Sequence, residues 1–131
     1  MSQENVETLA QFGNALNEGG IEATREFLDP AVELSEPPEQ PGATTFYGRE
    51  KVIEGFGRWS ENWATQRSEF ERVVDMDDTV LVLTRETLVG RDGLQVEQPC
   101  GTIFEFRAGK IVRFASFWDQ SAALEAVGLS E

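Results

Sequence analysis

The feature that most constrains the fold of this sequence is a change of apolar periodicity near residue 68. Before it, apolar residues recur every three or four positions, as in Leu9, Phe12 and Leu16, which is typical of amphipathic helices. After it, apolar and polar residues alternate, which is typical of half-buried strands. We therefore expect helices over 2–16, 21–28 and 48–63, a brief strand over 31–36, four long strands over 70–74, 79–89, 94–106 and 111–118, and a short terminal helix over 119–126.

This order of elements predicts an α+β fold in one domain, residues 1–131. Helices that precede a run of hairpin-connected strands pack on one face of a curved antiparallel sheet. A chain of 131 residues buries enough apolar surface for one core without disulfides. Gly55 and Gly57 weaken the third helix, so we expect a neighbouring element to approach it closely there.

Charge and residue usage exclude several classes of function. The formal charge of −13 disfavours nucleic acid and anionic membranes as partners. The absence of histidine removes Ser-His and Cys-His nucleophile systems and histidine-ligated metal sites. A single cysteine, Cys100, and no apolar stretch long enough for a membrane helix favour the cytoplasm. We expect no metal and no cofactor.

The turns predict which side chains share a face of the sheet. A two-residue turn at 92–93 would pair Arg85 with Cys100, and a three-residue loop at 107–109 would pair Cys100 with Ser116. The inner face then mixes apolar walls with separated polar groups: Leu83, Arg85, Thr87, Gln98, Cys100, Thr102, Phe104, Phe114, Ser116 and Trp118.

The opposite face would be too apolar to leave in water. It would carry Val80, Val82, Thr84, Glu86, Gly101, Ile103, Ala115 and Phe117. We therefore expect it to form a homodimer contact.

Five segments carry a resemblance to a known family: ALNEG at 15–19, FLDPAVE at 27–33, YGREKV at 47–52, GKIVRF at 109–114 and FWD at 117–119. With them the chain resembles the NTF2-like superfamily and, within it, the SnoaL-like proteins, which include polyketide cyclases and relatives of ketosteroid isomerase and limonene-epoxide hydrolase. The resemblance implies a cone, or cystatin-like α+β roll, in which a curved sheet wraps around the N-terminal helices. It also implies a ligand pocket at the open end and frequent dimers.

The resemblance also implies positions for catalytic groups. Glu36-Pro37 matches the carboxylate before a proline that shuttles the proton in the isomerase branch. Gly13 and Thr102 match the positions of its oxyanion-hole tyrosine and aspartate, so those donors are missing here. In the epoxide hydrolase branch an arginine bridges two aspartates; the resemblance makes Arg85 a candidate for that arginine, with Glu36 or Asp119 as its partner, but the sequence shows no matching pair of aspartates.

The candidate catalytic residues are therefore Glu36, Arg85 and Asp119, and each has a plainer interpretation. Glu36 is otherwise a solvated loop acid, Arg85 a cross-strand ion pair and Asp119 a helix N-cap. We expect Glu36 to face the cavity and Glu39 to face water. The candidate ligand-binding residues are Phe12, Leu16, Tyr47, Phe56, Trp59, Trp63, Leu83, Thr87, Gln98, Cys100, Thr102, Phe114, Ser116 and Trp118, although the aromatic residues also suit a core and Cys100 suits a buried filler.

Two functions remain open from the sequence. The first is a cofactor-free acid–base enzyme of isomerase, cyclase or hydrolase type that acts on a small apolar ring or polyketide-like compound. The second is a non-catalytic homodimeric ligand-binding or protein-interaction domain. The first requires Glu36 or Asp119 inside the pocket, whereas the second requires only an apolar cavity and the outer sheet face.

Overall fold

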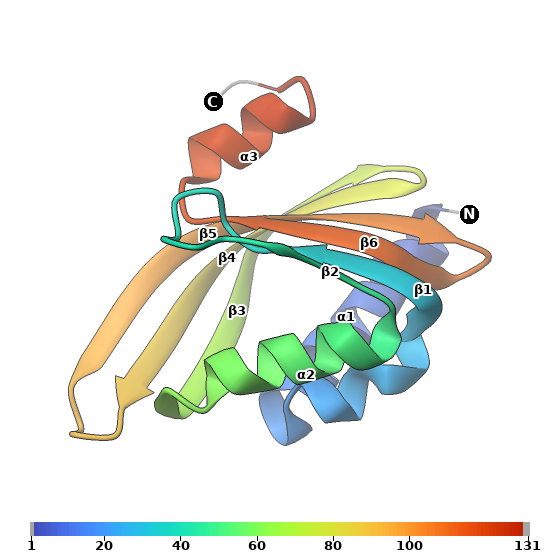
Figure 1. The fold of residues 1–131 in the computed structure, drawn as a ribbon. Helices are drawn as coiled ribbons and strands as arrows, with labels where there is room; N and C mark the ends of the chain where they lie inside the picture. The colour runs from blue at the N-terminus through green and yellow to red at the C-terminus, as the bar shows by residue number, and fades with distance from the viewer. Residues whose placement is uncertain (1, 130–131) are drawn as a thin grey trace.

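A computed structural model describes residues 2–129. These residues form three α-helices, one 3-10 helix and six strands, in the order α1 (Ser2–Gly19), η1 (Ile21–Phe27), β1 (Leu28–Ser35), β2 (Thr45–Tyr47), α2 (Arg49–Ser60), β3 (Trp63–Met76), β4 (Thr79–Gly90), β5 (Gln95–Arg107), β6 (Lys110–Phe117) and α3 (Gln120–Ala126). The sheet curves over α1 and α2, whereas α3 lies on its opposite, outer face (Figure 1). None of the helices formed by the described residues is long and apolar enough to span a membrane.

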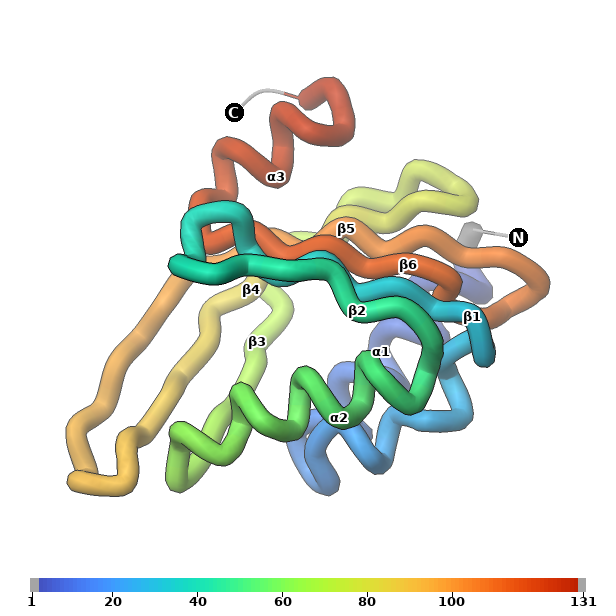
Figure 2. The backbone as a smooth tube through the Cα atoms, viewed as in Figure 1, coloured from blue at the N-terminus to red at the C-terminus, as the bar shows by residue number. Residues whose placement is uncertain are grey.

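All six strands belong to one open sheet in the order β2-β1-β6-β5-β4-β3. Neighbouring strands are antiparallel except β1 and β6, which run parallel. The predicted α+β cone is thus confirmed, with a mixed rather than wholly antiparallel sheet. The long β3, β4 and β5 bend away from the flatter part formed by β1, β2 and β6, so the β4–β5 loop lies near the end of α2 (Figure 2).

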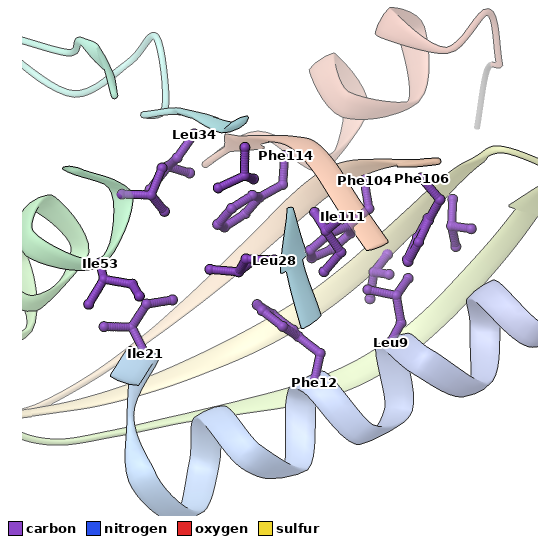
Figure 3. Close-up of a cluster of buried hydrophobic side chains, with 14 residues drawn as sticks. Leu9, Phe12, Ile21, Leu28, Leu34, Ile53, Phe104, Phe106, Ile111 and Phe114 are labelled. Atoms are coloured by element: carbon purple, nitrogen blue, oxygen red, sulfur yellow. The ribbon is translucent and has the colours of Figure 1, made fainter. Parts of the chain in front are cut away.

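The main core lies between the concave face of the sheet and the N-terminal helices (Figure 3). Leu9 and Phe12, spaced three apart on α1, point into it and are almost fully buried. Leu28 of β1 and Ile111 of β6 meet them from the sheet side. Burying each such side chain contributes about 1.5 to 3 kcal/mol, so packing rather than helix propensity holds α1 against the sheet.

A second, smaller core forms on the outer face of the sheet. Leu81 and Leu83 of β4 pack there against Ala123 and Leu124 of α3. Gly101 of β5 permits this contact, because a Cβ at that position would lie 2.5 Å from the Ala123 Cβ. Helix α3 therefore covers part of the surface that the sequence assigned to a second copy of the chain.

Both predicted hairpin loops were wrong in length. The β4–β5 loop has three residues, because the Gly90 N–H donates to the Leu94 carbonyl and Val89 pairs with Gln95. The Asp92 carboxylate accepts from the Leu94 N–H and draws Asp92 into this loop.

The β5–β6 loop has two residues. Arg107 pairs with Lys110, and both central residues, Ala108 and Gly109, have positive φ. A bulge between Glu105 and Phe106 keeps the inner side chains of β5 and β6 on the predicted face, although Thr102 pairs with Ser116 rather than with Phe114.

The extra residue in the β4–β5 loop shifts the pairing of β4 by one, and this exchanges its two faces. Thr84, not Arg85, pairs with Cys100. The predicted inner residues of β4 therefore lie outside, namely Leu83, Arg85 and Thr87. The predicted outer residues lie inside, namely Val80, Val82, Thr84 and Glu86.

Helix α2 is shorter than predicted. It ends at Ser60, so Trp63 begins β3 and pairs with Gly90 instead of extending the helical stripe. A Cβ at Gly55 would lie 2.6 Å from the Phe46 ring, which accounts for that glycine by close approach. Nothing lies within 4 Å of a Cβ built at Gly57, so the same expectation was wrong there.

Candidate functional site

A cavity of about 140 Å³ lies beneath the concave face of the sheet, between α1, α2 and the loop after β1. Most of its wall is aromatic: Phe12, Phe46, Phe56, Trp59, Phe70, Phe104, Phe114 and Trp118. The rings of Phe104 and Phe114 stack with an interplanar angle of 5° and centroids 5.6 Å apart. Phe12 contacts both edge-on. Such interlocked rings make a rigid apolar floor.

A minority of polar side chains interrupts the aromatic wall: Glu36, Gln40, Ser68, Thr84, Glu86, Cys100, Thr102 and Ser116. Most come from β3, β4, β5 and β6, so they form a band across the sheet. Among the residues that the structure describes, no lysine or arginine lines the cavity. An apolar cavity with a few convergent polar groups is the usual form of a small-molecule site.

Glu86 is the acid that the sequence prediction had placed on the outer face. It lies inside the cone and accepts a hydrogen bond from the Ser68 hydroxyl, with Oγ and Oε2 2.6 Å apart. Burial raises the pKa of Glu86 above its usual range, and the hydroxyls of Ser68 and Thr84 partly oppose that shift by favouring the carboxylate. A carboxyl group with a raised pKa in a cavity is a recognised mark of a functional site.

Ser68 is itself held by α1. The Asn17 side chain accepts from the Ser68 N–H and donates to the Ser68 carbonyl, each at 2.9 Å. This two-way contact fixes the backbone of β3 where its hydroxyl meets Glu86. Through Ser68, helix α1 therefore helps to position the carboxyl group of Glu86 on β4, the second strand from the β3 edge of the sheet.

Cys100 lines the same cavity but lacks the properties of a nucleophile. Burial, with the nearby carboxylates of Glu86 and Glu39, raises the pKa of the Cys100 thiol to about 12. The thiolate is the reactive form of cysteine, so this side chain stays an inert thiol near neutral pH.

The two acids of the loop after β1 have different surroundings. Glu36 lines the cavity and is half-buried, and its carboxylate accepts from the Thr44 N–H at 3.1 Å. Glu39 is exposed, as predicted, but its carboxylate accepts from the N–H groups of Trp118 and Asp119, each at 3.2 Å. Glu39 thus ties the loop to the end of β6, close to where α3 begins (Figure 1).

The structure brings many of the candidate site residues together around the cavity. Besides Glu36, they are Phe12, Leu16, Phe56, Trp59, Cys100, Thr102, Phe114, Ser116 and Trp118. Seven candidates lie elsewhere: Arg85, Asp119, Tyr47, Trp63, Leu83, Thr87 and Gln98.

The two displaced catalytic candidates have structural partners instead. Arg85 lies on the outer face, where it forms ion pairs with Glu71 at 3.3 Å and Glu97 at 3.2 Å. These pairs raise the pKa of Arg85 and favour its charged form. Asp119 is the N-cap of α3, and its carboxylate accepts from the Ser121 N–H at 2.9 Å. Both therefore follow the plainer interpretation.

The remaining displaced candidates have equally local explanations. Leu83 packs under α3, and Thr87 lies on the outer face of β4. Tyr47 ends the edge strand β2 and is 66% exposed. Trp63 contacts Trp59, with ring centroids 6.3 Å apart, but lies outside the cavity lining. Gln98 shares the inner face with Glu86 but likewise does not reach the cavity.

Sequence reasoning missed several lining residues, of which Ser68, Thr84 and Glu86 matter most. The signal that could have found Thr84 and Glu86 was the alternative loop length at 91–93, which places both on the inner face. Ser68 joins them through the β3–β4 pairing, whose register shifts between Phe70 and Arg72. Phe70 and Phe46 were missed because neither was assigned to the inner face. No cluster of three or more metal-ligating side chains occurs within residues 2–129.

The sequence and the fold of this chain are similar to those of known proteins. The model of the SnoaL-like domain matches residues 9–114. No curated protein matches the chain. Among solved structures, an NTF2-like protein of unknown function from Burkholderia pseudomallei superposes with a TM-score of 0.79 at 16% identity, covering 95% of this chain and 98% of that one.

Two further solved structures are similar. TerC, co-crystallised with polyporic acid, has a TM-score of 0.80 at 19% identity, covering 93% of this chain and 96% of its own. A protein from a Jannaschia species, named for the SnoaL-like polyketide cyclases, has a TM-score of 0.76 at 22% identity and covers 98% of this chain and 94% of its own. At these identities the likeness establishes the fold.

Proposed function

The chain belongs to the SnoaL-like domain family, and from that premise we propose that it binds a small, largely apolar ring compound in the cavity beneath the sheet. The single observation that carries this proposal is the aromatic wall, in which Phe104, Phe114 and Phe12 interlock. An apolar cavity of about 150 Å³ holds a molecule the size of benzene, so about 140 Å³ suits one ring, with further rings extending towards the mouth.

The neighbouring structures support a ring compound as the ligand class. TerC was crystallised with polyporic acid, and the Jannaschia protein is named for polyketide cyclases. Polyketide-like molecules would present both flat apolar surface and oxygen atoms to this cavity.

Tryptophan fluorescence tests the binding proposal directly, because Trp59 and Trp118 both line the cavity. Titration with naphthalene derivatives should quench this fluorescence saturably. Phe114→Ala, which removes a ring from the floor, should change the affinity, whereas Leu94→Ala, at an exposed loop position, should not. An unsaturable response, or one equal in both variants, would contradict the proposal.

An acid–base activity on the bound ring is a second candidate. It is favoured by two carboxyl groups, Glu36 and Glu86, that line one cavity without a cationic partner there. Carboxyl groups in an apolar site can exchange protons with a carbon acid. Proton exchange at the carbon next to the carbonyl of 2-tetralone, followed in D₂O by NMR, tests it with Glu36→Gln and Glu86→Gln. Acceleration by the wild type that either variant abolishes indicates an enzyme, and no acceleration indicates a binding domain.

We also propose a homodimer through the part of the outer face that α3 leaves uncovered, and a cytoplasmic location. Ala115 of β6 lies on that face beside Ile103 and is half-exposed. Ala115→Lys should therefore yield monomer in light scattering, with Leu94→Lys as a control at a remote exposed position. A dimer mass that survives Ala115→Lys in a folded protein would rule out this interface.

A further inference from the structure

The polar groups of the cavity are concentrated on adjacent positions of β3, β4 and β5. Ser68 pairs with Glu86, and Thr84 pairs with Cys100. Thr84 and Glu86 are two residues apart on one strand, so their side chains stand side by side on the inner face. The cavity consequently has an aromatic floor and, within its polar band, a compact patch made of Ser68, Thr84, Glu86 and Cys100.

Two groups in this patch have bonding capacity left for a ligand. The Ser68 hydroxyl engages Oε2 of Glu86, and among the described residues no side chain forms a hydrogen bond with Oε1 of the carboxyl group. Thr84 is 5% exposed, and its hydroxyl lies close enough to Glu86 to favour the carboxylate form but makes no hydrogen bond of normal geometry. Buried polar atoms are rarely left without a good hydrogen bond in proteins, so this hydroxyl is available to a ligand in the cavity.

We propose that Glu86, positioned by Ser68 and flanked by the Thr84 hydroxyl, is the specificity-determining group of the cavity and selects uncharged ring compounds that carry a carbonyl or hydroxyl oxygen. This inference rests on the proposed function, because it concerns which ligand the same cavity takes. The ring lies on the aromatic floor, and its oxygen meets the carboxyl group of Glu86 and the hydroxyl of Thr84.

The charges around the patch explain the preference for an uncharged ligand. Glu36 faces the cavity from the loop after β1, and Glu39 lies near Cys100 from the same loop. No lysine or arginine among the described residues lines the cavity to attract an anion. A carboxylate ligand would meet two acids and no cation, whereas a carbonyl oxygen accepts a hydrogen bond from the protonated form of Glu86, which its burial favours.

Three naphthalene probes of nearly equal shape test this inference: 2-acetylnaphthalene, 2-isopropenylnaphthalene and 2-naphthoate. Equilibrium dialysis at several pH values between 5 and 8 gives the Kd of each. One hydrogen bond gained on binding corresponds to about tenfold in affinity. We therefore expect the ketone to bind about tenfold more tightly than the hydrocarbon, and the naphthoate to bind most weakly. The preference for the ketone should fall as pH rises and Glu86 ionises.

Variants of Glu86 separate hydrogen bonding from shape. Glu86→Leu should abolish the preference for the ketone while keeping hydrocarbon binding. Glu86→Gln should keep the preference, because an amide N–H also donates, but should remove its pH dependence. Thr84→Val, which preserves shape, should lower the preference severalfold. Glu69→Gln, at an exposed acid of β3, is the control and should change nothing.

The outcomes distinguish this inference from the proposed function. If the wild type binds the hydrocarbon and the ketone equally, or if Glu86→Leu retains the preference with native circular dichroism, the inference is overturned and apolar binding stands. If none of the three probes binds to the wild type, both are overturned.

Discussion

Two glycines of α2 give a matched test of the packing between that helix and the cavity wall. Gly55 is buried, and a Cβ there would lie 2.6 Å from the ring of Phe46. A Cβ at Gly57 would have no neighbouring atom within 4 Å. Both sit within a helix of 12 residues, so the intrinsic gain from alanine is the same at each, about 1 kcal/mol. Any difference between the two variants therefore measures the contact with Phe46.

The expected magnitudes follow from this geometry. Gly57→Ala should raise the free energy of unfolding by about 0.5 to 1 kcal/mol. Gly55→Ala gains the same helix propensity but forces the Phe46 ring to move, and overpacking of this kind costs about 1 to 3 kcal/mol. We expect Gly55→Ala to be neutral or destabilising, and less stable than Gly57→Ala by about 1 to 3 kcal/mol.

Urea unfolding followed by circular dichroism measures both variants, with equal slopes required for a valid comparison. The functional readout is independent of stability. Phe46 also lines the cavity, so its displacement should weaken the binding of 2-acetylnaphthalene to Gly55→Ala but not to Gly57→Ala. Equal stabilisation of both variants would show that Phe46 does not limit the approach of α2, and the packing argument would be wrong.

Three further predictions concern the cavity and the outer face. Because burial raises the pKa of Glu86, this side chain binds a proton more tightly in the folded protein than in the unfolded one. The free energy of unfolding should therefore fall as pH rises above the usual glutamate range, and it should depend less on pH in Glu86→Gln, as urea unfolding can measure. At pH 8 a thiol with a pKa of about 12 is ionised about 2,000-fold less than free cysteine, and its thiolate is about 40-fold more nucleophilic. Cys100 should therefore react with a disulfide reagent on the order of fiftyfold more slowly, with guanidinium-unfolded protein as the control. Gly101→Val should destabilise the chain by about 1 to 3 kcal/mol and raise hydrogen exchange in α3, because its side chain would collide with Ala123; unchanged exchange would contradict the docking of α3 through Gly101.

Much of the fold could be predicted because its core repeats at regular intervals. The spacing of Leu9 and Phe12 predicted the buried face of α1, and the alternation after residue 68 predicted the long strands. Strand β2 escaped prediction because three residues, Thr45–Tyr47, are too few to show a period. The parallel pairing of β1 with β6 also escaped, because the two strands lie at opposite ends of the chain and no turn connects them.

The helical stripe of α2 shows how a regular spacing can mislead. Trp59 and Trp63 are four apart, as neighbours on one helix face would be, and their rings do meet. They meet across the junction between α2 and β3, however, because the helix ends at Ser60. The helical spacing correctly predicted that the two tryptophan rings are in contact, but it wrongly placed Trp63 in the helix instead of at the start of β3.

The chemistry of the cavity depended on one residue in one loop. Asp92-Gly93 favours a two-residue turn, and that turn would place Arg85 inside the cone. In the structure Arg91 joins the loop and donates from its Nε to the Glu61 carbonyl at 2.9 Å, a contact between segments 30 residues apart that no local pattern contains.

The resulting shift exchanges a cation for an acid at the polar patch. With Arg85 inside, the cavity would favour anions, and Glu36 would have had a partner for an ion pair. With Glu86 inside, the cavity has no positive charge among its described lining residues and favours uncharged ligands that offer oxygen to a carboxyl group. The apolar residues of β4 tolerate either register, since Leu81 and Leu83 suit a core as well as Val80 and Val82 do. The ligand preference of this domain is consequently set by the loop at 91–93 and by its anchor on the end of α2, both of which lie outside the cavity.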